Sequence, residues 1–229
     1  MIIHEVEQGS GDWLKLRLGI PTASEFDKII TPTGQLSKQS RKYSFYLAAE
    51  RLLKESLGSV EGNDWMDRGK ELEPEAIRMY EFDKKVKTQK VGFVTTDDGK
   101  IGASPDRLLI DVKGGLEMKC PAPQTHIAYS FDGFGSDYKV QVQGQMFVCE
   151  LDFIDRYSYH PKLLPYCETT PRDEPFIKLM ERALKDFNAF TDEVYDKFKT
   201  EGYFEEREQI ITPLERELGE DVGRIIMAG

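Results

Sequence analysis

The sequence predicts a single α/β domain in which a central mixed β-sheet is flanked by helices. The chain has 229 residues, a length at which one domain can hold one sizeable core. Its composition, 39% hydrophobic and 31% charged, is typical of a folded, soluble protein. Strand-like runs in the middle of the chain lie between helical patterns. No repeat or linker divides the sequence, so we expect one domain over residues 1–229 with a charged tail at 202–229.

Two helices are predicted in the first quarter of the chain. Thr22 or Ser24 can cap a short helix, because either hydroxyl can accept the free amide hydrogens of the first turn. The Thr-Pro-Thr-Gly run at 31–34 ends this helix. Apolar residues at helical spacing then predict a long helix over 38–57, ended by Gly58.

A third helical pattern runs from Asp64 to about Asp83 and contains a proline. Pro74 lacks an N–H and disfavours the helical backbone at Glu73. We therefore expect a kink or a break there, which could present Glu73 to a cleft.

Strands are predicted over residues 90–96 and 101–112, where the sequence alternates or runs apolar. Lys113-Gly114-Gly115 is a hairpin turn signal before a further strand at 116–120. The remaining elements are a helix over 138–150, a strand over 153–160 and a strongly amphipathic helix over 173–200.

The charge is unevenly distributed. The formal net charge is −10 and the isoelectric point about 5.0, which argues against a general nucleic-acid coat protein. Residues 14–54 nevertheless carry eight basic and three acidic side chains, a balance of +5, whereas residues 168–229 carry nine and sixteen, a balance of −7. The basic segment could meet an anion, although both segments could equally be solvated helix faces.

The sequence contains no stretch of about 18 apolar residues and no signal peptide pattern at its start. We therefore expect a cytoplasmic protein with no membrane partner. The three cysteines, Cys120, Cys149 and Cys167, are widely spaced, and we expect reduced thiols rather than disulfides or a zinc site.

One group of charged residues has the composition of a catalytic site. The predicted hairpin places Asp106 on one strand and Glu117 and Lys119 on its neighbour, and strand alternation points Glu117 and Lys119 to the same face, opposite Met118. Two carboxylates suit a hard cation such as Mg²⁺, and an ammonium can orient a water or stabilise a phosphoryl oxyanion. A simple cross-strand ion pair is the alternative.

The same residues carry a family resemblance. Ser104-Pro105-Asp106, followed by Glu117-Met118-Lys119, resembles the P-D…(D/E)-x-K signature of the restriction-endonuclease-like nuclease superfamily. The longer context is similar to the lambda exonuclease family of phage-type (YqaJ-like) alkaline exonucleases. It comprises Val6-Glu7-Gln8-Gly9, Trp13, Lys15-Leu16-Arg17-Leu18-Gly19-Ile20, Thr22-Ala23-Ser24-Glu25, Gly69-Lys70-Glu71-Leu72-Glu73, Glu117-Met118-Lys119-Cys120-Pro121 and Gln141-Val142-Gln143.

The resemblance implies a restriction-endonuclease-like core and a phage or prophage enzyme of the bacterial cell. Members are magnesium-dependent exonucleases that processively degrade the 5′-phosphorylated strand of linear duplex DNA in the 5′ to 3′ direction. They leave 3′ overhangs for recombination beside a single-strand annealing protein. The resemblance also implies a ring-shaped homotrimer and two Mg²⁺ ions, for which Mn²⁺ can substitute.

The resemblance assigns roles to individual residues. Asp106, Glu117 and the Met118 carbonyl would bind the metal ions, since two cations can stabilise the incoming and leaving oxygens together. Lys119 would help activate the attacking water, and Glu73 would hold a metal-bound water or assist the base.

A second set of residues matches the family's pocket for the terminal 5′-phosphate. These residues are Arg17 and Ser24, with Ser104 and Gln141 as lesser contributors. An Arg fork and a hydroxyl at a helix start are suitable phosphate donors, whereas a surface charge, a plain helix cap and a solvent-facing glutamine are the alternatives. The family's arginine in the loop after the first short helix has no counterpart here, because residues 31–37 contain no basic side chain.

Two other functions remain open at this point. An endonuclease or a structure-specific nuclease of the same superfamily would share Asp106, Glu117 and Lys119 but would need no 5′-phosphate pocket. A non-catalytic DNA-binding module would have lost the metal site or kept it for structure. The complete set with Glu73 argues against the module, and the context of Arg17 and Ser24 argues against the endonuclease.

Overall fold

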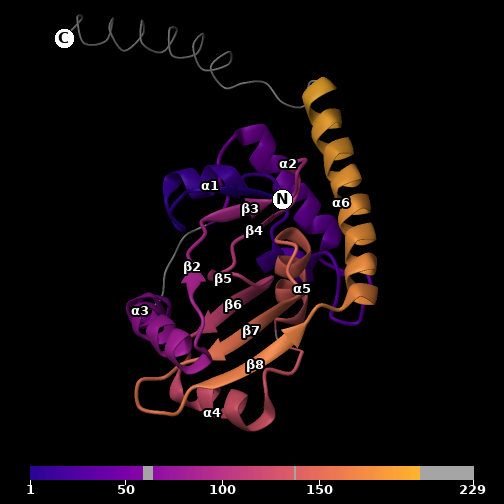
Figure 1. Cartoon of the computed structure of the whole chain (residues 1–229). Coiled ribbons are helices and arrows are strands. Elements are labelled where there is room, and N and C mark those ends of the chain that lie inside the picture. Colours follow the sequence, from indigo (N-terminus) through magenta and orange to yellow (C-terminus); the bar gives the residue numbers. More distant parts are fainter. Residues whose placement is uncertain (59–63, 137, 202–229) are drawn as a thin grey trace, which may run out of the picture.

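The computed structural model describes residues 1–58, 64–136 and 138–201 and contains two β-sheets (Figure 1). The larger sheet has the strand order β2-β5-β6-β7-β8, in which β6 and β7 are parallel and the other neighbours antiparallel. Its strands are β2 (Thr88–Gln89), β5 (Arg107–Leu109), β6 (Gly114–Lys119), β7 (Phe153–Ser158) and β8 (Tyr166–Pro171). The predicted mixed sheet is therefore confirmed.

The smaller sheet is antiparallel, with the order β1-β3-β4. It consists of β1 (Ile2–His4), β3 (Phe93–Thr95) and β4 (Gly102–Ala103). The helical elements are α1 (Gly11–Arg17), the 3₁₀ helix η1 (Ala23–Lys28), α2 (Ser40–Leu53), α3 (Asp64–Lys84), α4 (Pro123–Asp132), α5 (Lys139–Val148) and α6 (Glu174–Thr200). In the described part of the chain, no helix is both long and apolar enough to cross a membrane.

Two groups of buried side chains pack the helices and the sheets against one another. The larger core joins η1, α2, α5 and α6 and includes Phe26, Met146 and Leu184. The smaller core lies between α3 and the large sheet, with Tyr80 and Leu116 among its members. Figure 1 shows the result, with α3 on one side of the sheet and α6 lying along α2.

Three helix predictions need correction. The long helix ends at Leu53 rather than Gly58, because Lys54 takes a left-handed backbone conformation with φ 57°. Helix α3 continues through Pro74, so a break at Glu73, one of the two expectations, is wrong, because the next turns pack Ala76 and Tyr80 into the smaller core. The helix near residue 22 is a 3₁₀ helix, and the Thr22 side chain makes no capping hydrogen bond to it.

The strand predicted over 101–112 is two short strands that belong to different sheets. Residues 104–106 separate β4 from β5, so the chain leaves one sheet and enters the other at Ser104-Pro105-Asp106. The predicted hairpin is confirmed, but Gly114 and Gly115 lie within β6 and not in the turn. A Cβ at Gly114 would come 2.5 Å from the Phe153 ring, which explains the glycine in a strand.

The helix over 173–200 is confirmed as α6, where the Asp173 carboxylate accepts a capping hydrogen bond from the Phe176 N–H. All three cysteines are free thiols, as expected. The elements β1, α1, β2, α4 and β8 are additional to those predicted. The predicted tail at 202–229 lies outside the described residues.

Candidate active site

The predicted carboxylates and lysine meet where β5 pairs with β6. Arg107, the first residue of β5, is the register partner of Leu116, so Asp106 lies just before β5 and opposite Glu117. The Met118 N–H donates a 2.6 Å hydrogen bond to Asp106 Oδ2. The Lys119 ammonium contacts Glu117 Oε1 at 2.6 Å. We call Asp106, Glu117 and Lys119 the carboxylate cluster.

Side chains alternate along β6, as predicted, so that Glu117 and Lys119 point away from the smaller core. Leu116 and Met118 pack into the smaller core against α3. Glu117 and Lys119 lie on the opposite face, where Glu117 meets side chains of α5 and the Lys119 ammonium lies 4.8 Å from the centre of the Tyr138 ring.

Two glutamines of α5 hold the buried Glu117 carboxylate, which is 3% exposed. Gln141 Nε2 donates to Glu117 Oε1 at 2.8 Å, and Gln145 Nε2 donates to Oε2 at 2.7 Å. Sequence reasoning identified Gln141 but missed Gln145. The available signal was the spacing, since residues four apart share one face of a helix.

The cluster is electrostatically crowded. Burial and the neighbouring charge of Glu117 raise the pKa of Asp106 to about 8, with a smaller contribution from Glu73 on α3. Burial alone would lower the pKa of Lys119, but Glu117 and Asp106 outweigh it and raise this pKa. Lys119 is therefore a fixed positive charge at neutral pH, and the Glu73 carboxylate acts on the cluster from α3.

The donors at this site fit a magnesium ion. Among the described residues, no group of three or more His, Cys, Asp and Glu side chains could hold a metal by itself. The carboxylates of Asp106 and Glu117 offer oxygen ligands of the kind that Mg²⁺ prefers, and Mg²⁺ usually keeps several water ligands. Since burial and Glu117 raise the pKa of Asp106, a bound cation would favour the charged form of this carboxyl.

A second cluster surrounds Arg17, and we call Arg17, Thr22 and Ser24 the arginine cluster. The Arg17 guanidinium donates to the hydroxyls of Thr22 and Ser24, at 3.1 and 3.4 Å. Burial lowers the pKa of Arg17. Arg17 and Ser24 are thus brought together as predicted. Thr22, expected only as a helix cap, uses its hydroxyl in this cluster instead.

Trp13 links the arginine cluster to the segment that leads to Asp106. The centre of its ring lies 4.1 Å from the Arg17 guanidinium carbon, and its indole N–H donates a 3.0 Å hydrogen bond to the Ser104 hydroxyl. Ser104 precedes Asp106 by two residues. Ser104 is thus linked through Trp13 to the arginine cluster, whereas Gln141 contacts the carboxylate cluster and makes its hydrogen bond to Glu117.

The fold is also found in solved nuclease structures. The alkaline exonuclease LHK-Exo from Laribacter hongkongensis matches with a TM-score of 0.75 and 28% identity, over 85% of this chain and 98% of that chain. The same values hold for LHK-Exo in complex with dAMP. A phage related exonuclease from Haemophilus somnus 129PT shares the fold, with a TM-score of 0.61 and 16% identity over 78% and 96% of the two chains. The chain thus has the restriction-endonuclease-like fold.

A search of curated proteins gave no match. The sequence profile of the YqaJ-like viral recombinase domain matches residues 12–152. This range includes the arginine cluster, Trp13, Ser104 and the carboxylate cluster. The protein is therefore a member of the YqaJ-like viral recombinase domain family.

Proposed function

We propose that the protein is a magnesium-dependent exonuclease that degrades the 5′-phosphorylated strand of linear duplex DNA processively, in the 5′ to 3′ direction. It would leave 3′ single-stranded overhangs for recombination by single-strand annealing. The family and the similarity to an alkaline exonuclease support the coarser part of this proposal, a nuclease of the phage exonuclease type.

One observation supports the finer part. Trp13 contacts both Arg17 of the arginine cluster and Ser104, two residues before Asp106 of the carboxylate cluster. A half-buried guanidinium with two hydroxyls is a suitable site for a terminal phosphate. Its connection to the carboxylates would seat the end of a DNA strand next to the group that cleaves it. An endonuclease needs no such arrangement.

The carboxylate cluster would supply the hydrolytic chemistry. Asp106, Glu117 and the Met118 carbonyl would hold two Mg²⁺ or Mn²⁺ ions, which stabilise the charge that develops on the attacking and leaving oxygens. Lys119, as an ammonium, would orient the attacking water and stabilise the phosphoryl oxygen. Glu73 would hold a further water on the side of α3.

The nucleotide bound to a similar enzyme is consistent with the product expected from this reaction. LHK-Exo has been solved in complex with dAMP, and a nucleoside 5′-monophosphate is what a 5′ exonuclease of this kind releases. We further propose a homotrimer and a single-strand annealing protein as partner, on the strength of the family resemblance. A mass measurement in solution tests the first, since a clear monomer would contradict a ring.

Three DNA substrates test the function directly. We expect rapid digestion of linear duplex with a 5′-phosphate, slow digestion with a 5′-hydroxyl and none of a covalently closed circle. Digestion of both linear substrates should require Mg²⁺, so each reaction is compared with and without a chelator. Efficient cutting of the circle would favour the endonuclease, and indifference to the 5′-phosphate would refute the role of the arginine cluster.

A further inference from the structure

Arg17 is not held in place by packing on all sides. A cavity of about 460 Å³ lies against it, lined by residues of α1, η1 and α2 that include Lys28, Lys42, Tyr43 and Glu50. The position of a long side chain at the wall of a cavity therefore depends in part on its backbone. The backbone in question is the turn after α1, in which Gly19 separates Arg17 from Thr22 and Ser24.

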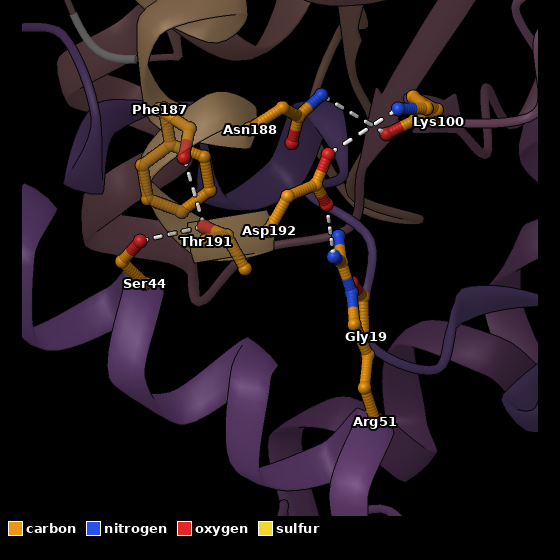
Figure 2. A network of polar contacts seen from close by, with 8 residues as sticks. All are labelled: Gly19, Ser44, Arg51, Lys100, Phe187, Asn188, Thr191 and Asp192. Carbon is orange, nitrogen blue, oxygen red and sulfur yellow. Dashed lines mark hydrogen bonds and ion pairs between the residues drawn. The ribbon is translucent and has the colours of Figure 1, made fainter. Parts of the chain in front are cut away.

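Consecutive residues of α2 hold both polar groups of Gly19. Glu50 Oε2 accepts a 3.0 Å hydrogen bond from the Gly19 N–H, and Arg51 Nε donates a 2.6 Å hydrogen bond to the Gly19 carbonyl. Gly19 has φ +68°, and a Cβ there would come 2.3 Å from Arg51 Cγ. The turn is therefore seated directly on the Arg51 side chain (Figure 2).

The other end of Arg51 is held by α6. Arg51 Nη1 contacts Asp192 Oδ1 at 2.6 Å, and Lys100 Nζ contacts Asp192 Oδ2 at 3.3 Å. Figure 2 shows Asp192 between these two cations, with Asn188 Nδ2 donating to the Lys100 carbonyl at 3.4 Å. A continuous set of polar contacts thus runs from α6 through Arg51 to the turn that places Arg17.

We propose that Glu50, Arg51 and Asp192 are positioning residues for the arginine cluster and thereby set the selectivity for a 5′-phosphate. This inference rests on the proposed function of that cluster. The three side chains act on the geometry between Arg17 and Ser24 through the Gly19 peptide. A small displacement of a binding group can cost up to about 100-fold in rate, so this indirect support is measurable.

The contact between α2 and α6 offers a matched control. Ser44 of α2 and Thr191 of α6 share a buried 2.5 Å hydrogen bond, and Thr191 also donates to the Phe187 carbonyl (Figure 2). This pair joins the same two helices but makes no contact with Gly19. Ser44→Ala should therefore weaken the helix packing without changing the arginine cluster.

The experiment compares kcat/KM on linear duplex bearing a 5′-phosphate with kcat/KM on the same duplex bearing a 5′-hydroxyl. Arg51→Ala should lower the value for the phosphorylated duplex about tenfold, within the range for a misplaced binding group, and leave the 5′-hydroxyl value nearly unchanged. Asp192→Ala, which keeps the bond from Arg51 to Gly19, should do the same to a smaller extent. Ser44→Ala should leave the ratio at the wild-type value.

The outcomes separate this inference from the proposed function. Equal losses on both substrates in Arg51→Ala would show general destabilisation and overturn the positioning role. If Arg51→Ala does not fold, Asp192→Ala decides, and an unchanged ratio there overturns the role as well. Loss of the 5′-phosphate preference in Arg17→Ala, with full preference in Arg51→Ala and Asp192→Ala, would overturn the positioning role alone. No preference for a 5′-phosphate in the wild-type protein would overturn the positioning role and the phosphate site together.

Discussion

The Trp13 indole N–H donates a 3.0 Å hydrogen bond to the Ser104 hydroxyl while the face of the same ring lies against the Arg17 guanidinium. Trp13 and Ser104 are 91 residues apart in the chain. One aromatic side chain of α1 therefore connects the proposed phosphate site with the segment that leads to Asp106. Substitutions at Trp13 should consequently affect both ends of the active site.

Trp13→Phe and Trp13→Ala separate the two contacts of this ring. Phenylalanine keeps an aromatic face for Arg17 but loses the donor to Ser104, a hydrogen bond worth about 1 kcal/mol, so we expect about a fivefold loss of kcat/KM on 5′-phosphorylated DNA. Alanine also loses the cation–π contact, about 1 kcal/mol more, and should cost about 30-fold. Steady-state kinetics measure both. Equal activity of the alanine variant and the wild type would contradict the connection.

Lys119→Ala should nearly abolish turnover, by a factor of about 100 to 1,000, the usual cost of removing one donor to a developing oxyanion. Binding of duplex DNA in the presence of Mg²⁺ should persist, because the carboxylates and the arginine cluster are intact. Single-turnover digestion and a binding titration give the two readouts. Retained cleavage would rule out the proposed role of the ammonium.

Gln145→Leu tests a residue found only in the structure. Gln145 is 1% exposed and donates to Glu117, so its loss should reduce Mg²⁺ affinity or activity about 10- to 100-fold, as for other residues that orient a metal ligand. Gln143→Leu is a matched control on the same helix. Gln143 is 2% exposed and bonds to the main chain of Pro171 and Asp173.

We expect Gln143→Leu to lower stability while keeping the Mg²⁺ concentration at half-maximal activity unchanged. The comparison is decisive because both variants lose a buried amide from α5. If both variants shift the Mg²⁺ dependence equally, Gln145 has no specific role at Glu117.

Mg²⁺ should raise the thermal unfolding midpoint of the wild-type protein, since a ligand that binds only the folded state stabilises it. Asp106→Asn removes one proposed ligand with little change of shape and should abolish this rise. Thermal denaturation with increasing Mg²⁺, against a chelator, measures the effect without relying on catalysis. An undiminished rise in the variant would place the ion elsewhere.

Glu81 should contribute acid-sensitive stability. Hydrogen bonds from the Thr88 hydroxyl and N–H lower the pKa of Glu81 below its ordinary value of 4.5. A carboxyl whose pKa is lower in the folded state stabilises the fold above pH of about 4.5, and this stability is lost as the pH falls further. Glu81→Gln keeps an acceptor for Thr88, so denaturant titrations from pH 6 to 3 should show a shallower loss. An unchanged slope would contradict the assignment.

Local patterns predicted the parts of the structure that depend on neighbouring residues. Alternation along one strand was enough to place Glu117 and Lys119 on the same face, and spacing along the chain was enough to recognise α6. The same rules failed where a segment changes partners. Residues 101–112 look like one strand, yet the chain passes from one sheet to the other at Ser104-Pro105-Asp106.

The glycines of β6 show a second kind of failure. Gly114-Gly115 is a strong turn signal by itself, but both residues are buried strand positions packed against Phe153, Leu151 and Ile154. Their role depends on the side chains of a segment almost 40 residues further on. No local pattern contains that information.

By itself, the sequence determined which reactive groups are present and which of them share a strand face, because a period of two residues follows directly from backbone geometry. Only the tertiary structure decided which distant residues support them. Gln145 reaches Glu117 from 28 residues away, and Asp192 reaches Arg51 from 141 residues away. Such contacts arise from how helices pack on the sheet and on each other, and packing partners are set by the shape of the whole core.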